Sequence, residues 1–405
     1  MSERIVKKKN ILVLSEVHIG GEWIATHRVI KAMSLLPRAP KFILVCFAEE
    51  YEKQNLSDFV RVTRLRFAKA HSVVTFFSSL VKNFVNTRQS IIQDKERVGH
   101  IDYVLCTHFL MMLAIISVPR LWKTPKVYYF HGIKSSIIVS LRQIRYYEVV
   151  TKALERIALI LSNAIITPSQ WSKQYVKKMI GPASLFVKIY VVPNGMPKEY
   201  LTPIVLNTET ATKFQKLGID PHHKIVLYSG RVNRIKGVDL ILDACKNLVS
   251  RHNNILLIVA YPTYSSDGSC LDELRRKTID YGLSDNIRFL PDPQIGQLRV
   301  LYQISDLSIL PSLIEMGPLA FIESLASGTP CIATPVGDMD VVLSRVDPSL
   351  VLRNNSSQEI QRAVNYYFNL PKERIKKIKL RCREVARLYT IRDQAIRFAR
   401  VLEAI

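Results

Sequence analysis

Short apolar segments alternate with stretches of helical periodicity along most of this 405-residue chain. Buried strands of a parallel sheet read as short apolar runs, and each needs a crossover, usually a helix, to reach the next strand. The alternation therefore predicts an α/β fold with parallel sheets, and the length predicts two or three domains. The expected strands are 11–15, 42–47, 101–106, 127–130, 164–167 and 190–192, followed by 225–228, 255–260, 286–290 and 306–310.

Positive charge is in excess and is unevenly placed. The chain carries 57 Lys and Arg against 34 Asp and Glu, and residues 1–200 hold 30 of the basic residues against 13 acidic ones. Such a field attracts nucleic acid, anionic membranes or phosphorylated substrates. No nucleic-acid recognition motif accompanies the charge, so a membrane or a phosphorylated ligand suits it better than nucleic acid does.

Cysteine usage and hydropathy bear on the compartment. Six cysteines are scattered along the chain without C-x-x-C spacing or a clear disulfide framework, which favours a reducing compartment such as the cytoplasm. We expect no signal peptide, because the N-terminus is polar and basic. We also expect no transmembrane segment, because the most apolar run, 104–118, is shorter than a span requires.

The segment 310–337 reads as a strand end, a loop, a helix and a second strand. Pro318 suits the first turn of a helix, Gly328 suits the position just past its end, and Pro330 prevents continuation. These signals predict a helix over 318–327. Its N-terminal tip, Gly317–Leu319, would offer unpaired N–H groups to a phosphate.

Two carboxylates accompany this helix. Glu315 lies in the preceding loop and Glu323 lies inside the helix. Glu323 is placed to accept hydrogen bonds from ribose hydroxyls, and Glu315 from a transferred sugar. The alternative is that both glutamates merely favour the N-terminal half of a helix.

A second motif opens the second half of the chain. It is the string Gly230-Arg231, four further residues and then Lys236-Gly237, which follows an expected strand and leads into a helix over 238–248. A guanidinium fork and an ammonium charge both suit a diphosphate, although charged loop residues are often simply solvated.

Together these residues resemble the retaining GT-B glycosyltransferases of the family-four type, which use nucleotide sugars. The family's E-x7-E pattern is matched in register by the set Glu315, Pro318, Leu319, Glu323, Ala326, Gly328 and Pro330. Met316 and Gly317 replace the family's Gly-Phe, and Ser324 replaces an alanine. The Gly230–Gly237 string is similar to the family's G-R and K-G positions and comes in the expected order.

The resemblance implies a domain organisation. It predicts two Rossmann-like domains with parallel sheets that face a central cleft: an acceptor-binding domain over 1–195 and a nucleotide-sugar-binding domain over 196–380. The turn Pro193-Asn194-Gly195 resembles the family's hinge. A C-terminal helix over 381–405 would cross back to the first domain.

The resemblance also implies roles for further residues. His131, after the strand 127–130, resembles the family's active-site histidine, and Gly20-Gly21 resembles its glycine loop. Catalysis would rest on His131, Arg231, Lys236 and Glu315. The nucleotide sugar would contact Gly20, Gly21, Arg231, Lys236, Glu315, Met316, Gly317, Pro318, Leu319 and Glu323. Phe289, Leu290 and Pro291 are candidates for lining the base. We expect no metal or other cofactor and treat Asp338-Met339-Asp340, a D-x-D string, as coincidental.

The resemblance implies transfer of a sugar from a UDP- or GDP-sugar, with retention, to a lipid-linked or glycan acceptor at the cytoplasmic membrane surface. The alternatives are a nucleic-acid- or membrane-binding protein without transferase activity, and a GT-B relative with other chemistry.

The apolar face of a helix around 73–85, flanked by Arg64, Arg66, Lys69 and Arg88, either packs on the sheet or dips into an anionic bilayer. Trp122, Tyr128, Tyr129, Tyr146 and Tyr147 are either core residues or part of the same surface.

Overall fold

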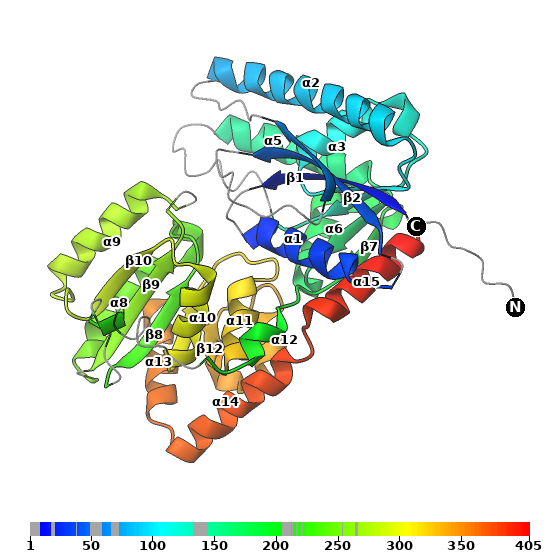
Figure 1. Cartoon of the computed structure of the whole chain (residues 1–405). Coiled ribbons are helices and arrows are strands. Elements are labelled where there is room, and N and C mark those ends of the chain that lie inside the picture. The colour runs from blue at the N-terminus through cyan, green and yellow to red at the C-terminus, as the bar shows by residue number, and fades with distance from the viewer. Residues whose placement is uncertain are drawn as a thin grey trace, which may run out of the picture. The chain divides into compact units, whose positions relative to one another are not determined.

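The computed structural model describes residues 9–17, 21–37, 39–48, 59–65, 73–132, 145–204, 222–252, 254–263 and 266–405, and five residues between 212 and 219. The chain forms two compact units. Unit 1 comprises Met1–Pro193 and Ile391–Ile405, and unit 2 comprises Asn194–Thr390. Each unit is built on its own sheet of parallel strands, as the alternating pattern predicts (Figure 1).

The sheet of unit 1 has seven strands in the order β3-β2-β1-β4-β5-β6-β7. They are β1 (Asn10–Val17), β2 (Lys41–Ala48), β3 (Phe59–Leu65), β4 (Tyr103–Cys106), β5 (Lys126–Tyr129), β6 (Ala164–Thr167) and β7 (Lys188–Val191). Ile11 pairs with Phe42 on one side and with Tyr103 on the other, so β1 is central. The edge strand β3 was missing from the strands expected from the sequence.

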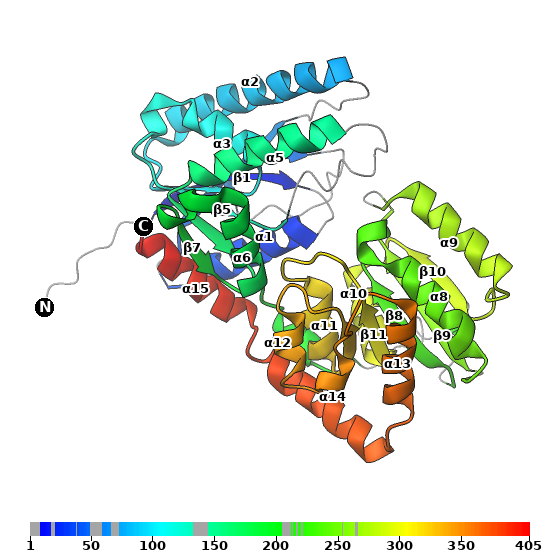
Figure 2. The same ribbon diagram turned by 180° about the vertical axis from the view of Figure 1, so that it is seen from behind.

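Helices cover both faces of this sheet. The helices of unit 1 are α1 (Gly21–Ser34), α2 (Val73–Val98), α3 (Phe109–Ile116), α5 (Arg145–Ile160), α6 (Gln170–Ile180) and α15 (Ile391–Glu403), with 3₁₀ turns η1 (Pro119–Leu121) and η2 (Gly181–Leu185). Helices α1 and α15 pack together, and their apolar side chains share one core with β1 and β2. Helix α3 contacts both α2 and α5, and these three lie together away from α1 and α15 (Figures 1 and 2).

Unit 2 has a five-stranded sheet in the order β10-β9-β8-β11-β12. Its strands are β8 (Lys224–Ser229), β9 (Ile255–Tyr261), β10 (Ile287–Pro291), β11 (Leu307–Leu310) and β12 (Cys331–Ala333). Its helices are α8 (Val238–Val249), α9 (Gly268–Asp280), α10 (Ile295–Ile304), α11 (Leu319–Ser327), α12 (Met339–Leu343), α13 (Ser357–Phe368) and α14 (Lys372–Ala386), with 3₁₀ turns η3 (Lys198–Leu201), η4 (Arg234–Lys236) and η5 (Pro348–Leu350).

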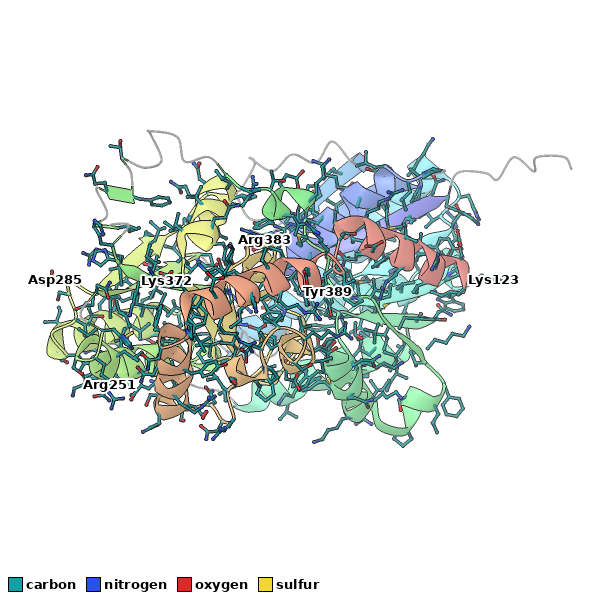
Figure 3. The ribbon with its side chains drawn as sticks, turned by 90° about the horizontal axis from the view of Figure 1, so that it is seen from below. Lys123, Arg251, Asp285, Lys372, Arg383 and Tyr389 are labelled. Atoms are coloured by element: carbon teal, nitrogen blue, oxygen red, sulfur yellow. The ribbon has the colours of Figure 1, made fainter. Side chains whose placement is uncertain are left out.

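The C-terminal end of α11 is fixed by a neighbouring helix. Gly328 takes the left-handed conformation at the helix end, with φ of 83°, as predicted from the sequence. Arg383, on α14, donates to the carbonyl of Ser327 at 3.1 Å, and Figure 3 shows Arg383 on that helix between Lys372 and Tyr389. A cation at a helix C-terminus offsets the exposed carbonyls and the negative end of the dipole. The helix that carries Glu323 is therefore held at its far end.

Two expectations from the sequence need correction. Helix α11 begins at Leu319, with Pro318 as its N-cap rather than in its first turn. The expected boundary at 380/381 falls inside α14, which belongs to unit 2, and the segment that returns to unit 1 starts at Ile391. For Tyr128 and Tyr129, left open between core and outer surface, the structure decides for the core: they are 1% and 0% exposed.

Helix α2 differs from its expected amphipathic pattern. Asn83, expected on the polar side, is 1% exposed, whereas Val81, expected on the apolar side, is 61% exposed. Arg66 and Lys69, expected to flank this helix, lie outside the described residues. Among the residues that the structure describes, no helix is both long and apolar enough to span a membrane.

Candidate active site

The site in unit 2 lies where its strand order changes direction. The chain runs from β8 outward through β9 to β10, and then returns to β11 on the other side of β8. The loops after β8 and β11 therefore leave the sheet side by side at its carboxyl end, where open α/β sheets bind ligands. A backbone hydrogen bond of 2.8 Å from Leu313 to Ile235 joins the two loops.

The backbone of the loop after β8 requires glycine at position 237. Gly237 has φ of 66°, and a Cβ there would stand 2.5 Å from the carbonyl oxygen of Pro311. The side chain of Asn233 accepts from the backbone N–H of Lys236 at 3.1 Å and caps the short turn η4. The Tyr228 hydroxyl donates to the carbonyl of Arg231 at 2.5 Å. These contacts fix the backbone that carries Arg231 and Lys236.

Lys236 and Glu315 meet between the two loops. Lys236 Nζ lies 2.5 Å from Glu315 Oε1, and their side chains are 15% and 12% exposed. Ser312 Oγ donates to the same carboxylate oxygen at 3.0 Å. The pKa of Lys236 is lowered from its usual value, chiefly by burial; the Glu315 carboxylate opposes this shift, and the nearby positive charge of Arg231 adds to it. Three residues predicted from the sequence, Arg231, Lys236 and Glu315, therefore form one partly buried, charged cluster.

Helix α11 starts beside this cluster. Its N-cap is Pro318, which makes no side-chain capping bond, so the first-turn N–H groups have no N-cap side chain as acceptor. Met316 and Gly317 precede it in the loop, and the Gly317 carbonyl accepts from the Asn194 side chain at 2.7 Å. Glu323 lies in the second turn and is 5% exposed. Burial, and then the charge of Glu323, raises the pKa of Tyr302 well above its usual range, which places this phenol near the carboxylate.

The residues predicted to line the base lie elsewhere on the sheet. Phe289, Leu290 and Pro291 belong to β10 itself, rather than to a loop after it. Strand β9 separates β10 from β8, so these residues are about 10 Å, two strand spacings, from the loop after β8. The structure therefore places them on the same sheet as the Lys236–Glu315 pair without joining them to it.

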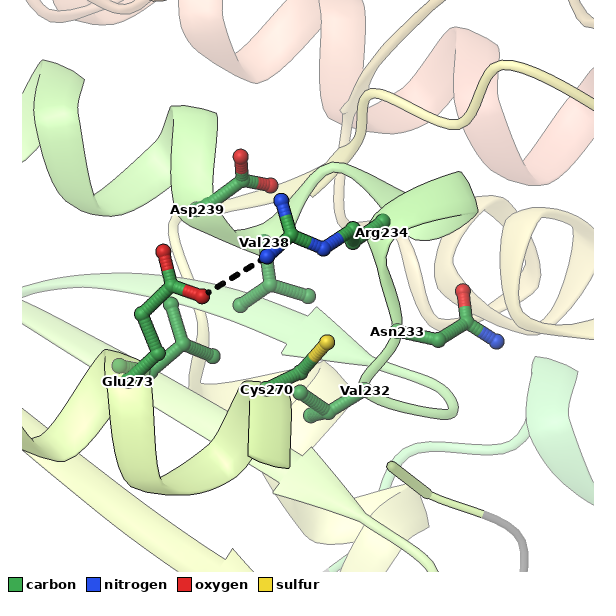
Figure 4. A pocket seen from close by; sticks show the side chains of 8 residues that line it. Val232, Asn233, Arg234, Val238, Asp239, Cys270 and Glu273 are labelled. Carbon is green, nitrogen blue, oxygen red and sulfur yellow. Dashed lines mark hydrogen bonds and ion pairs between the residues drawn. The ribbon is translucent and has the colours of Figure 1, made fainter. Parts of the chain in front are cut away.

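A small hollow lies on the α9 side of the loop after β8. Val232, Arg234, Cys270 and Glu273 help to line it, and Arg234 Nη2 reaches Glu273 Oε2 at 3.2 Å. Figure 4 shows this pair, with the Asn233 side chain pointing away from it. The hollow holds about 20 Å³, room for roughly one water molecule. The Arg234–Glu273 ion pair links the loop to α9, and the hollow is too small to be a substrate pocket.

His131 and the glycine loop belong to unit 1. His131 lies two residues beyond the end of β5, and its Nε2 lies 3.0 Å from Thr26 Oγ1 on α1. Its ring is 3.8 Å from that of Tyr129, whose hydroxyl accepts from the Gln394 side chain on α15 at 2.9 Å. Gly21 is the first residue of α1, while Gly20 lies outside the described residues.

Sequence reasoning missed several supporting residues. Tyr228 and Ser312 hold the loops and the carboxylate, yet neither belongs to the two motifs. Asn194 was noted only as part of a turn, although it binds the loop before α11. Its place in the turn Pro193-Asn194-Gly195, where the second unit begins, is the one signal that pointed to it. No group of three His, Cys, Asp or Glu side chains suited to a metal occurs in the part of the chain that the structure describes.

The fold and its loops define a GT-B architecture: two α/β units with parallel sheets, one of which presents a cationic loop beside a helix N-terminus. Solved structures share this fold at low sequence identity. Sucrose-phosphate synthase from Thermosynechococcus elongatus superposes with a TM-score of 0.78 at 17% identity, over 98% of this chain and 99% of that one. HepE from Anabaena, solved with UDP and glucose, superposes with a TM-score of 0.73 at 17% identity, over 98% and 99%.

Family models match both units. The model "Glycosyltransferase Family 4" matches residues 42–200, and "Glycosyl transferases group 1" matches residues 209–384. The chain therefore belongs to the GT-B glycosyltransferases of the family-four type. Curated relatives named D-inositol 3-phosphate glycosyltransferase are 30% identical over 174 residues in Corynebacterium aurimucosum and 27% identical over 175 residues in Jonesia denitrificans. Each alignment covers 42% of this chain and only 41% of the relative.

Proposed function

We propose that this protein transfers a sugar, with retention and without a metal ion, from a nucleoside diphosphate sugar to an acceptor in the cytoplasm. The observation that carries the proposal is the Lys236–Glu315 pair beside the N-terminus of α11. Lys236 and Arg231 would neutralise the leaving diphosphate together with the first-turn N–H groups of α11, as preorganised charges do in other active sites. The donor is a UDP- or GDP-sugar, and HepE, which shares the fold, has been solved with UDP.

In this proposal the two glutamates bind different parts of the donor. Glu315 accepts from hydroxyls of the transferred sugar, and Lys236 exchanges its contact with Glu315 for the diphosphate. Glu323, deeper along α11, accepts from the ribose hydroxyls. His131, whose ring contacts Thr26 and Tyr129, is a further catalytic residue in this proposal.

The acceptor is the least constrained part of the proposal. A lipid-linked or glycan acceptor at the membrane's inner face suits the basic first half of the chain, with 30 basic against 13 acidic residues in 1–200. The name of the curated relatives, D-inositol 3-phosphate glycosyltransferase, favours a second candidate, a phosphorylated polyol such as an inositol phosphate. A lipid-phosphate-linked acceptor and an inositol phosphate both carry phosphate, which the same positive field attracts.

A transfer assay tests the reaction. The protein would be incubated with UDP- and GDP-sugars in EDTA, with inositol phosphate or with a polyprenyl-phosphate glycan as acceptor, and the product would be followed by NMR. We expect a product whose new anomeric centre has the configuration of the donor. A product of inverted configuration, or transfer that requires added magnesium, would contradict the retaining, metal-independent mechanism.

The lowered pKa of Lys236 predicts how donor affinity depends on pH. The ammonium form binds the diphosphate, and it predominates below the pKa of the free protein. Because burial lowers this pKa from 10.5, affinity should begin to fall at a lower pH than it would for an exposed lysine. Titration of UDP and GDP by calorimetry from neutral to alkaline pH would measure the fall. In Lys236→Arg, whose guanidinium does not titrate, the same fall would count against this assignment.

A further inference from the structure

Two large apolar side chains project from unit 1 just before its edge strand β7. Leu185 and Phe186, at the end of η2, are 83% and 87% exposed. Neighbouring Val187 and Ile189 are buried, so the pair marks the point where the chain leaves the core. Adjacent Leu and Phe side chains this exposed are unusual, since burying one such side chain typically gains about 1.5–3 kcal/mol.

Exposed apolar side chains also occur on α5. Val149, Ile157 and Leu161, on α5 and just after it, are 64%, 45% and 46% exposed. The Arg156 guanidinium lies 3.6 Å from where a Cβ on Gly181 would stand, so the end of α5 meets the start of η2. We call Val149, Ile157, Leu161, Leu185 and Phe186 the α5–η2 surface.

The same stretch of chain is basic. Residues 149–190 contain Lys152, Arg156, Lys173, Lys177, Lys178 and Lys188. The stretch has a single acidic residue, Glu155, which is 0% exposed. Lys177 and Lys178 are exposed on the last turn of α6, directly before η2. Within residues 149–190, all of which the structure describes, exposed aliphatic and aromatic side chains therefore occur together with positive charge and with no exposed carboxylate.

We propose that the α5–η2 surface docks this protein onto an anionic lipid bilayer. Apolar side chains that enter the headgroup region, surrounded by Lys and Arg that pair with anionic lipids, are the pattern of peripheral membrane contacts. A second copy of the chain would bring like charges together on this face. Nucleic acid would use the lysines and leave Leu185 and Phe186 in water. The surface belongs to unit 1 and the donor loops to unit 2, so the inference does not depend on the donor.

Vesicle co-sedimentation tests the proposal with the full chain and no nucleotide. We expect binding to mixed phosphatidylcholine–phosphatidylglycerol vesicles and little binding to phosphatidylcholine alone. Leu185→Ser with Phe186→Ser should lower the partition coefficient at least about tenfold, because two apolar side chains no longer enter the bilayer. The matched control is Ile279→Ser on α9, where the isoleucine is 71% exposed, and it should bind as wild type does.

Charge is tested separately. Lys177→Glu with Lys178→Glu should weaken binding strongly, whereas Lys376→Glu with Lys377→Glu, the same change at exposed positions on α14, should have a small effect. In Phe186→Trp, tryptophan emission should shift to the blue with anionic vesicles only. Wild-type protein that does not bind anionic vesicles, serine variants that bind as wild type does, or equal losses from both charge reversals would each overturn the proposal.

Discussion

Replacing Lys236 with alanine is expected to lower affinity for the nucleoside diphosphate, and kcat/KM for transfer, by about 100- to 1,000-fold. Two effects combine. The variant loses a cation that burial keeps partly out of water, and it leaves the Glu315 carboxylate, 12% exposed, without the ammonium that now lies 2.5 Å away. Without the ammonium, the negative charge of the diphosphate is no longer neutralised, and the unpaired carboxylate also repels it.

Calorimetry with UDP and GDP would measure this loss. Lys376→Ala, an exposed lysine on α14 of the same unit, provides the control and should bind as wild type does. The double variant Lys236→Ala with Glu315→Gln should recover part of the binding of the free nucleotide, because the repelling charge is gone, without recovering transfer. Donor affinity within about threefold of wild type in Lys236→Ala would show that the diphosphate binds elsewhere.

Gly237→Ala is expected to destabilise unit 2 by about 2–5 kcal/mol and to abolish donor binding. Gly237 has φ of 66°, a conformation that costs a residue with a Cβ about 1–2 kcal/mol. The added methyl would also stand 2.5 Å from the Pro311 carbonyl, which is backbone and cannot swing aside. The two loops would have to separate, and with them Lys236 and Glu315.

Gly282→Ala separates the cost of the left-handed backbone conformation from the cost of the steric clash. Gly282 follows α9 with φ of 67°, but a Cβ there would meet nothing within 4 Å. The control should therefore lose only the conformational part, about 1–2 kcal/mol, and should keep its affinity for nucleotide. Urea unfolding of both variants would provide the comparison. Equal destabilisation of the two would mean that the close approach of Gly237 to Pro311 is not a constraint.

Most of the fold follows from sequence because local patterns and connectivity determine it. Continuous apolar runs mark buried parallel strands, and Gly328 marks the end of α11 where only a left-handed residue fits. Strand β3 was missed because, at the sheet edge, its Arg61 and Arg64 interrupt the apolar run. The passage from unit 2 to unit 1 near Thr390 was missed because no glycine or proline punctuates the helical pattern there.

The site was predictable in its parts but not in its assembly. Both motifs and their carboxylates were found by spacing and by resemblance to a family. That Lys236 pairs with Glu315, 79 residues away, depends on β11 returning to the far side of β8, which no local pattern reports. Supporting contacts such as Ser312 to Glu315 and Asn194 to Gly317 have the same origin. They arise from loops that only the finished sheet brings together.

The most direct test of this account is a thermal-shift panel of UDP, GDP, ADP and their common sugars, run in EDTA and again with magnesium, on wild type and on Lys236→Ala. A ligand that binds only the folded state raises its melting temperature. We predict that one nucleotide family stabilises the wild type without metal and that the shift disappears in Lys236→Ala. If millimolar nucleotide leaves the wild type unshifted, or shifts both proteins equally, the donor site is not at the Lys236–Glu315 pair.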